Sequence, residues 1–296
     1  MAEIEHEHSE YVARKAMWRK YRDLYVGGEQ LREHATEYLI RRQKEPLEVY
    51  VERLSRVFYE NYVGSIIDWY AATLFRREPV LSFEGNDEAG KAFFGELTED
   101  CDRRGTSLAD FYRKQVVEAL VSGRGYTLVD FPRQPAPAAT RAEEEALGAS
   151  RAYLERYTPE EVIDWSFDER GNYEWVVLRT SQFRRERWNE AGIRETRWIY
   201  YDKEEFKIWR RVEGQEKPEK PQLIDAGRHG LASLRQVPLF PLTVSEGLWL
   251  MNKAALVQLE HFNKSNALSW ALTMGLFAMP VVYTERDWKQ IVGEAY

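Results

Sequence analysis

The sequence predicts an α+β protein with a helical N-terminal region, an antiparallel β-rich region and one long helix that leads into a small β module. Residues 1–122 carry apolar side chains at three- and four-residue spacing, the period of an amphipathic helix. Residues 123–247 alternate polar and apolar side chains between turn motifs, as antiparallel strands with one wet face do. Residues 248–278 return to helical spacing without a proline, and a strand is expected to follow them.

Two long helices are predicted near the N-terminus. Ser9 is a suitable N-cap for the first, and Gly27 a suitable end, because serine accepts backbone N–H bonds and glycine adopts left-handed backbone. The second helix is predicted over 46–75, where one broad apolar stripe runs without interruption. Its end is expected just before Pro79, since the residue preceding a proline disfavours helix.

A short strand over 80–83 and a third helix over 87–103 come next in the prediction. Ser107 then opens a capping-box motif with Asp110, which predicts a further helix. Gly123 is expected to end that helix and to turn the chain directly into the first long strand.

The β-rich region begins with a proline- and alanine-rich stretch, 132–150, that predicts an exposed, mobile insertion. The turn-forming segment 168–172 predicts a hairpin, and two further turns at 189–192 and 202–205 predict antiparallel neighbours. The predicted strands are 126–131, 163–167, 173–180, 197–201, 206–209 and 237–244.

Composition excludes several classes of protein. The net charge is −7, which argues against a simple basic clamp for nucleic acid. Cys101 is the sole cysteine, so neither an intramolecular disulfide nor a cysteine-rich metal site is expected. The longest apolar run, 268–282, is interrupted by polar and helix-breaking residues, so no membrane span and a cytoplasmic type of compartment are predicted.

The sequence offers few candidates for catalysis. His229 lies in a predicted loop and is the best of the five histidines, but no metal-ligand spacing accompanies it. Cys101 has acidic neighbours, which raise the pKa of a thiol. No catalytic, metal or cofactor residue is therefore predicted. Five tryptophans punctuate the predicted hairpins, and packing is their preferred interpretation: Trp165, Trp175, Trp188, Trp198 and Trp209.

The long helix over 248–278 is polar along one strip and apolar around the rest. We expect its apolar strip to be buried only by association with other copies, and its polar strip to face water or line a channel. The residues expected at this assembly or channel surface are Lys253, Leu256, Phe262, Asn263, Lys264 and Asn266.

The order of these parts resembles that of tailed-bacteriophage portal proteins, the head–tail connectors of phage capsids. Each matching segment is short, and their shared order along nearly the whole chain carries the resemblance. Those segments are 18–27, 50–61, 74–79, 105–108, 123–132, 157–165 and 237–241. The resemblance implies that residues 1–247 form the portal wing, 248–278 the first stem helix and 279–296 the start of a truncated clip. The first clip residues are Pro280, Val281, Val282 and Tyr283.

The resemblance also implies binding partners and a location in the virion. Portal subunits form a ring, usually a dodecamer, through which double-stranded DNA passes without sequence specificity. Such a ring docks the terminase large subunit and the head–tail adaptor, and contacts capsid and scaffold proteins. It lies at one capsid vertex of the virion and is assembled in the cytoplasm of the bacterial host. Because the terminase supplies the power, neither enzyme activity nor a cofactor is expected of the portal.

Two alternatives remain open on the sequence. The first is a hydrolase or carbohydrate-binding module that uses the tryptophan-rich sheet, with His229 and carboxylates nearby, and Trp198 as its test residue. The second is a generic phage or prophage scaffold partner. The portal hypothesis predicts a ring with a central hole, whereas the carbohydrate hypothesis predicts a soluble monomer with an aromatic site.

Overall fold

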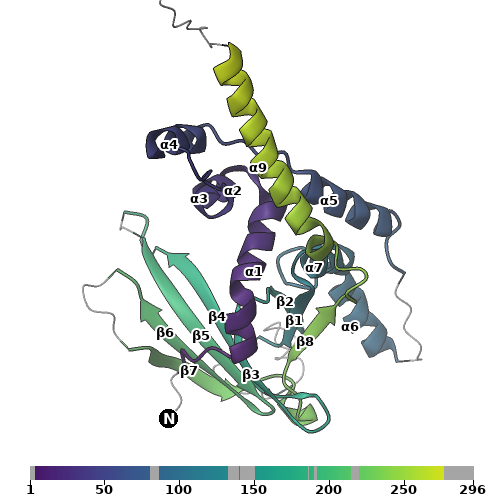
Figure 1. Cartoon of the computed structure of the whole chain (residues 1–296). Helices are drawn as coiled ribbons and strands as arrows, with labels where there is room; N and C mark the ends of the chain where they lie inside the picture. Colours follow the sequence, from purple (N-terminus) through teal and green to yellow (C-terminus); the bar gives the residue numbers. More distant parts are fainter. Residues whose placement is uncertain are drawn as a thin grey trace, which may run out of the picture.

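The computed structural model describes residues 4–80, 87–132, 140, 151–185, 187–189, 192–214 and 220–276. It confirms the α+β class: a helical lobe lies beside two antiparallel sheets, and one long helix leaves the lobe at the top of Figure 1. The described α-helices are α1 (Ser9–Val26), α2 (Gly28–Glu33), α3 (Ala35–Tyr38), α4 (Leu47–Ser55), α5 (Tyr62–Leu74), α6 (Glu88–Glu99), α7 (Leu108–Ser122) and α9 (Leu250–Leu276).

The ends of α1 and α7 follow local capping chemistry. His8, one residue before the predicted Ser9, caps α1 by accepting from the N–H of Glu10 at 3.1 Å. Ser107 caps α7 as predicted, since its hydroxyl accepts from the backbone N–H three residues on at 3.2 Å. Gly123 ends α7 at a φ of 84°, a left-handed conformation that glycine adopts without strain.

The predicted helix over 46–75 is two helices, α4 and α5, separated by non-helical residues 56–61. Asn61 starts α5 by accepting from the N–H of Gly64 at 2.8 Å. Its amide also donates to the carbonyl of Tyr25 at 2.7 Å, so the break is tied to the end of α1. The apolar stripe continues across the break, and this is why periodicity alone predicted one helix.

The strands form two antiparallel sheets. The three-stranded sheet has the order β2-β1-β8 and the five-stranded sheet the order β3-β4-β5-β6-β7. Their bounds are β1 Arg124–Asp130, β2 Tyr153–Tyr157, β3 Val162–Phe167, β4 Tyr173–Arg184, β5 Ile193–Asp202, β6 Glu205–Val212, β7 Gln222–Arg228 and β8 Leu239–Thr243. The hairpin around 168–172 is confirmed, and β2 and β7 are strands that the sequence prediction lacked. The predicted strand at 80–83 and the insertion at 132–150 lie almost entirely outside the described residues.

An extended N-terminal segment crosses the outer face of the five-stranded sheet before α1 begins. Glu5 pairs with Arg211 on β6, and Glu7 pairs with Arg179 on β4 at 2.8 Å. The ring of His8 stacks on a tryptophan of β3 with 4.2 Å between the ring centroids. This segment buries part of the sheet and joins it to the helical lobe.

Candidate assembly surface

The first half of α9, residues 250–266, is packed into the helical lobe; we call it the docked half. It contacts α1, α5 and α7. Met251 and Ala255 are completely buried, and Phe262 is 1% exposed with its ring edge-on to Tyr59 at 5.9 Å. These side chains belong to the same apolar core as Leu24 of α1, so the chain itself buries the docked half.

Two amide side chains of the docked half bond the non-helical backbone between α4 and α5. Asn266 donates to the carbonyl of Phe58 at 2.9 Å and accepts from its N–H at 3.2 Å. Gln258 donates to the carbonyl of Glu60 at 2.8 Å and accepts from the N–H of Val63 at 3.3 Å. Buried backbone groups require hydrogen-bond partners, so these amides supply what the broken helix lacks.

A third amide, that of Asn263, bonds the segment after α3. It donates to the carbonyl of Tyr38 at 3.0 Å and accepts from the N–H of Ile40 at 2.8 Å. Asn263 and Asn266 were expected on a wet channel strip, and Phe262 on an exposed assembly strip. The structure corrects these three placements, because all three residues hold α9 to its own chain.

The other predicted residues of α9 lie on its outward face. Leu256 is 72% exposed, and Val257 beside it is 71% exposed. Lys264 is exposed and pairs with Glu260 one turn earlier at 2.9 Å. Lys253 is exposed as well and donates to a backbone carbonyl just before the helix at 2.6 Å. A narrow charged strip and an apolar pair therefore share this face.

The second half of α9, residues 267–276, extends beyond the lobe; we call it the projecting half. Asn266 is the last buried residue of the helix, so about 15 Å of helix at 1.5 Å per residue lies beyond the chain's own packing (Figure 1). The projecting half contains no charged residue. Its exposed apolar side chains are Leu268, Leu272, Met274 and Leu276.

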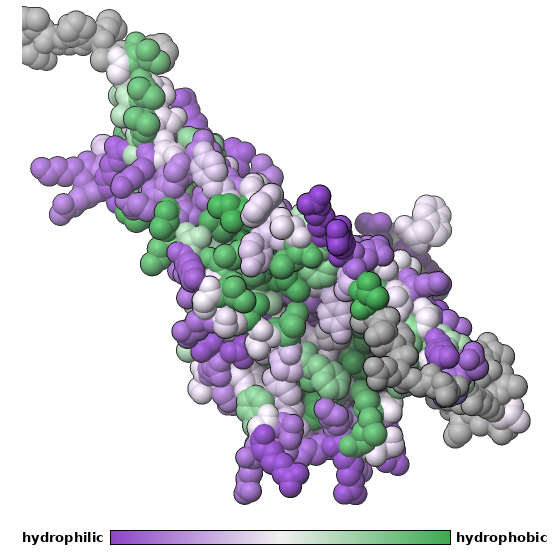
Figure 2. All heavy atoms as spheres, turned by 90° about the vertical axis from the view of Figure 1, so that its right-hand side faces the viewer, coloured by the Kyte–Doolittle hydropathy of each residue, from purple (hydrophilic) through white to green (hydrophobic). Residues whose placement is uncertain are grey.

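The exposed face of α5 adds a second apolar surface beside the docked half of α9. Tyr62, Ile66 and Trp69 recur along one side of α5 and are 54%, 55% and 67% exposed. His261 of α9 meets the ring of Tyr62 edge-on at 5.1 Å between centroids, so the two helices form one continuous surface. Figure 2 shows hydrophobic residues gathered at the end of α9 and again across the middle of this side of the molecule.

Residues Pro280, Val281, Val282 and Tyr283, predicted to begin the clip, lie outside the described part of the chain. The division into wing, stem and clip therefore stays a prediction. A long helix, α9, occupies the segment predicted as the stem and runs from Leu250 to Leu276 in the described residues.

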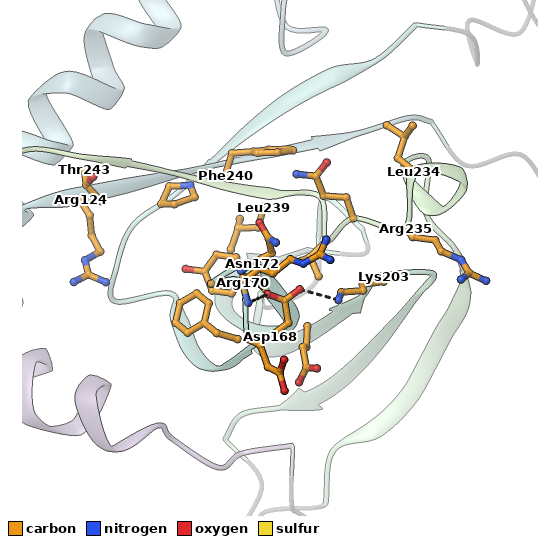
Figure 3. A pocket seen from close by; sticks show the side chains of 18 residues that line it. Arg124, Asp168, Arg170, Asn172, Lys203, Leu234, Arg235, Leu239, Phe240 and Thr243 are labelled. Atoms are coloured by element: carbon orange, nitrogen blue, oxygen red, sulfur yellow. Dashed lines mark hydrogen bonds and ion pairs between the residues drawn. The ribbon is translucent and has the colours of Figure 1, made fainter.

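A cavity of about 1100 Å³ lies between the β3–β4 turn and β8 (Figure 3). Asp168 projects into it, and its carboxylate accepts from the N–H of Asn172 at 2.9 Å and from Lys203 at 3.2 Å. These donors hold the pKa of Asp168 below its usual value, with the Asn172 N–H the largest cause. The carboxylate is thereby committed to holding the hairpin turn, and nothing in its bonding marks it as an acid or base for catalysis.

Two residues of the enzyme and carbohydrate hypotheses, His229 and Trp198, are buried, whereas Trp175 and Trp209 are partly exposed and line a second cavity. Ring Nε2 of His229 donates to the carbonyl of Asp202 at 2.9 Å, and the residue is 5% exposed. Trp198 is 2% exposed and the guanidinium of Arg211 lies 4.8 Å from the centre of its ring, so the ring offers no free face to a sugar. Burial raises the pKa of the Cys101 thiol to about 11, which leaves it protonated and unreactive at neutral pH.

Comparisons with protein-family models and with curated proteins find no match for this chain. Across the part of the chain that the structure describes, no cluster of acidic, histidine or cysteine side chains is arranged to hold a metal ion. Within that same part, no helix combines the length and the apolar character that crossing a membrane requires.

Proposed function

We propose that this chain is the structural subunit of a tailed-phage portal ring and that the projecting half of α9 is part of its subunit interface. The observation that carries the proposal is the contrast along one helix. One face of α9 up to Asn266 is buried within the chain, whereas none of the next ten residues is buried or charged, and Leu268, Leu272, Met274 and Leu276 among them are exposed. The resemblance in the order of parts supplies the identity of the assembly.

Association between subunits would explain why these apolar side chains are exposed in the single chain. Burying one leucine or methionine contributes about 1.5–3 kcal/mol, so covering Leu268, Leu272 and Met274 together supports a specific interface. A surface of this kind on one side of a subunit, meeting a different surface on the next, makes head-to-tail contacts, which form a ring when the rotation between subunits closes. The exposed face of α5, with Ile66 and Trp69, is suited to receive the neighbour's helix.

The remaining parts of the proposal follow from a portal's role. The ring lies at a capsid vertex, passes double-stranded DNA and docks the terminase large subunit and the head–tail adaptor in turn. A conduit requires weak adhesion to DNA, because each neutralised phosphate adds salt-dependent affinity. A net charge of −7 agrees with that requirement.

The test is imaging of the product of the complete reading frame by negative-stain electron microscopy, beside the double variant Leu268→Asp/Leu272→Asp. We expect rings with a central hole from the natural protein. The variant is expected to stay folded and to lose its rings, because two carboxylates in an apolar contact must be desolvated.

Leu234→Asp is the matched control, since Leu234 is 66% exposed in a 3₁₀ turn beside the sheets. Its rings are expected to persist. Compact monomers from the natural protein at high concentration would contradict the portal proposal. Intact rings in the double variant would instead show that the interface lies away from the projecting half.

A further inference from the structure

The far end of the β4–β5 hairpin presents aromatic rings and arginines to solvent. Phe183 at the end of β4 is 65% exposed, and Trp188 in the turn is 92% exposed. Arg184, Arg185 and Arg194 around them are exposed as well. Exposed rings of this size are costly in water, and their combination with guanidinium groups indicates a binding surface rather than a packing surface.

Strand register places Phe183 and Arg194 on one face of the hairpin. Phe183 lies directly opposite Arg194 in the antiparallel pair, so the two side chains point to the same side of the hairpin. The guanidinium of Arg185 lies 5.9 Å from the centre of the Phe183 ring. The Phe183 ring thereby lies between Arg194 of β5 and Arg185, the residue that follows β4.

These arginines have no acidic partner among the described residues. Arg184, Arg185 and Arg194 form no ion pair there, whereas Arg179 lower on the same strand pairs with Glu7 at 2.8 Å. Residues 183–194 contain four arginines and two glutamates, so this end of the sheet has an excess of positive charge in a chain whose net charge is −7. The acidic net charge of the whole chain argued against a basic surface, but a net charge does not exclude a local cluster of arginines such as this one.

We propose that this hairpin tip binds single-stranded nucleic acid. Arg185 and Arg194 contact phosphates, and unstacked bases stack on Phe183 and Trp188. Proteins that bind single strands combine cationic side chains along the backbone with aromatic rings on which bases stack. A duplex keeps its bases stacked on one another and offers them to no exposed ring, so the single strand is the favoured ligand. This site is independent of the ring proposal.

The β3–β4 turn at the opposite end of the sheet provides an internal comparison. Its aromatic residue, Phe167, stacks on Tyr173 with 4.7 Å between centroids, and its lysine partner, Lys203, pairs with Asp168. Arg170 in that turn is exposed and forms no ion pair among the described residues. Arg170→Ala is therefore a control that removes another exposed arginine from the same sheet.

The experiment measures the fluorescence anisotropy of three labelled ligands of equal length during titration with the full chain. They are an oligothymidylate, a single-stranded RNA and a DNA duplex. Two phosphate contacts are expected to weaken single-strand binding about sevenfold between about 50 and 200 mM salt. The DNA and RNA arms tell which single strand is preferred, and tighter binding of either than of the duplex supports the proposal.

Three variants locate the site. Trp188→Ala is expected to weaken binding about tenfold through the lost stacking. Arg185→Ala/Arg194→Ala is expected to weaken binding and to flatten its salt dependence, while Arg170→Ala leaves both unchanged. Circular dichroism checks that each variant is folded. The proposal would be overturned if neither tip variant changed the affinity for single strands. It would also be overturned if duplex and single strand bound equally tightly and Trp188→Ala caused no loss of affinity.

Discussion

The docked and projecting halves of α9 belong to one uninterrupted helix, yet they meet different surroundings. The docked half carries charged and amide side chains, and Gln258, Asn263 and Asn266 each bond backbone in two directions. The projecting half carries no charge and buries none of its residues within the chain. Folding of the lobe therefore depends on the first half only, and assembly is expected to depend on the second. We therefore expect single mutations to alter folding and assembly separately.

The largest effect on folding is expected from Phe262→Asp in the docked half. Removing a buried phenylalanine costs about 3–5 kcal/mol, and burying a carboxylate adds to this, so a loss above about 4 kcal/mol is expected. Urea denaturation followed by circular dichroism measures the free energy of unfolding. Phe262→Leu, which keeps the site apolar, is the control. Wild-type stability in Phe262→Asp would show that the docked half is not part of the core.

Glu45→Gln tests the loop that Asn263 holds. Glu45 and Arg53 form a bidentate pair at 2.9 Å with both side chains buried, and Arg53 also donates to the carbonyl of Ile40. Breaking such a pair costs about 3 kcal/mol, because it leaves a buried charge without its partner. Thermal denaturation at neutral pH measures this loss, and an unchanged melting temperature would contradict it.

The same pair gives a pH dependence with a defined sign. The hydrogen bond from Arg53 holds the pKa of Glu45 below its usual value, so the carboxylate stabilises the folded chain above the unfolded glutamate pKa of about 4.3. That contribution is lost as the pH falls through the lower folded pKa. The stability gap between the natural chain and Glu45→Gln should therefore narrow below about pH 4. A gap that stayed constant down to acid denaturation would contradict the assignment.

Asn266→Leu tests the amide contacts with a smaller effect. Leucine keeps the volume but leaves the N–H and carbonyl of Phe58 without partners, which costs about 2 kcal/mol. Hydrogen exchange is expected to quicken at the Phe58 N–H in particular. Lys264→Leu on the outward face of the same helix is the control and should change stability by less than about 0.5 kcal/mol. If Asn266→Leu and Lys264→Leu changed the stability equally, the buried and outward faces of α9 would not differ in their contribution to folding.

The smallest folding effect is expected in the projecting half. Leu268→Asp/Leu272→Asp should alter the free energy of unfolding of the monomer by less than about 0.5 kcal/mol, since both side chains already face solvent. Denaturation of dilute protein, below the concentration at which it associates, provides the measurement. A loss comparable to that of Phe262→Asp would mean that the two halves of α9 are not separable.

Local chemistry in the sequence predicted the features that depend on neighbouring residues. Ser107 and Gly123 mark the two ends of α7 because a cap hydroxyl and a left-handed glycine act within one turn of the helix. The hairpin around 168–172 was predicted for the same reason. The α+β class was therefore predicted correctly, although strands β2 and β7 and the division between α4 and α5 were not.

Features that depend on distant residues were missed. The break at 56–61 exists because Asn266 and Gln258, some two hundred positions later, satisfy its backbone. The same polar residues were predicted to face solvent, because a polar residue in a sequence does not show whether its hydrogen-bond partner is water or protein. Strand β7 lacks alternation because nearly all of its residues are exposed, so no period marked it.

Three amides on α9 have a consequence beyond stability. A slip of one residue along an α-helix rotates its side chains by about 100° and moves them 1.5 Å, so a shifted α9 would lose the partners of Gln258, Asn263 and Asn266 together. Those contacts thereby set the azimuth of the helix beyond them. In the proposed ring, these three amides would therefore fix which side of Leu268 and Leu272 faces the neighbouring subunit.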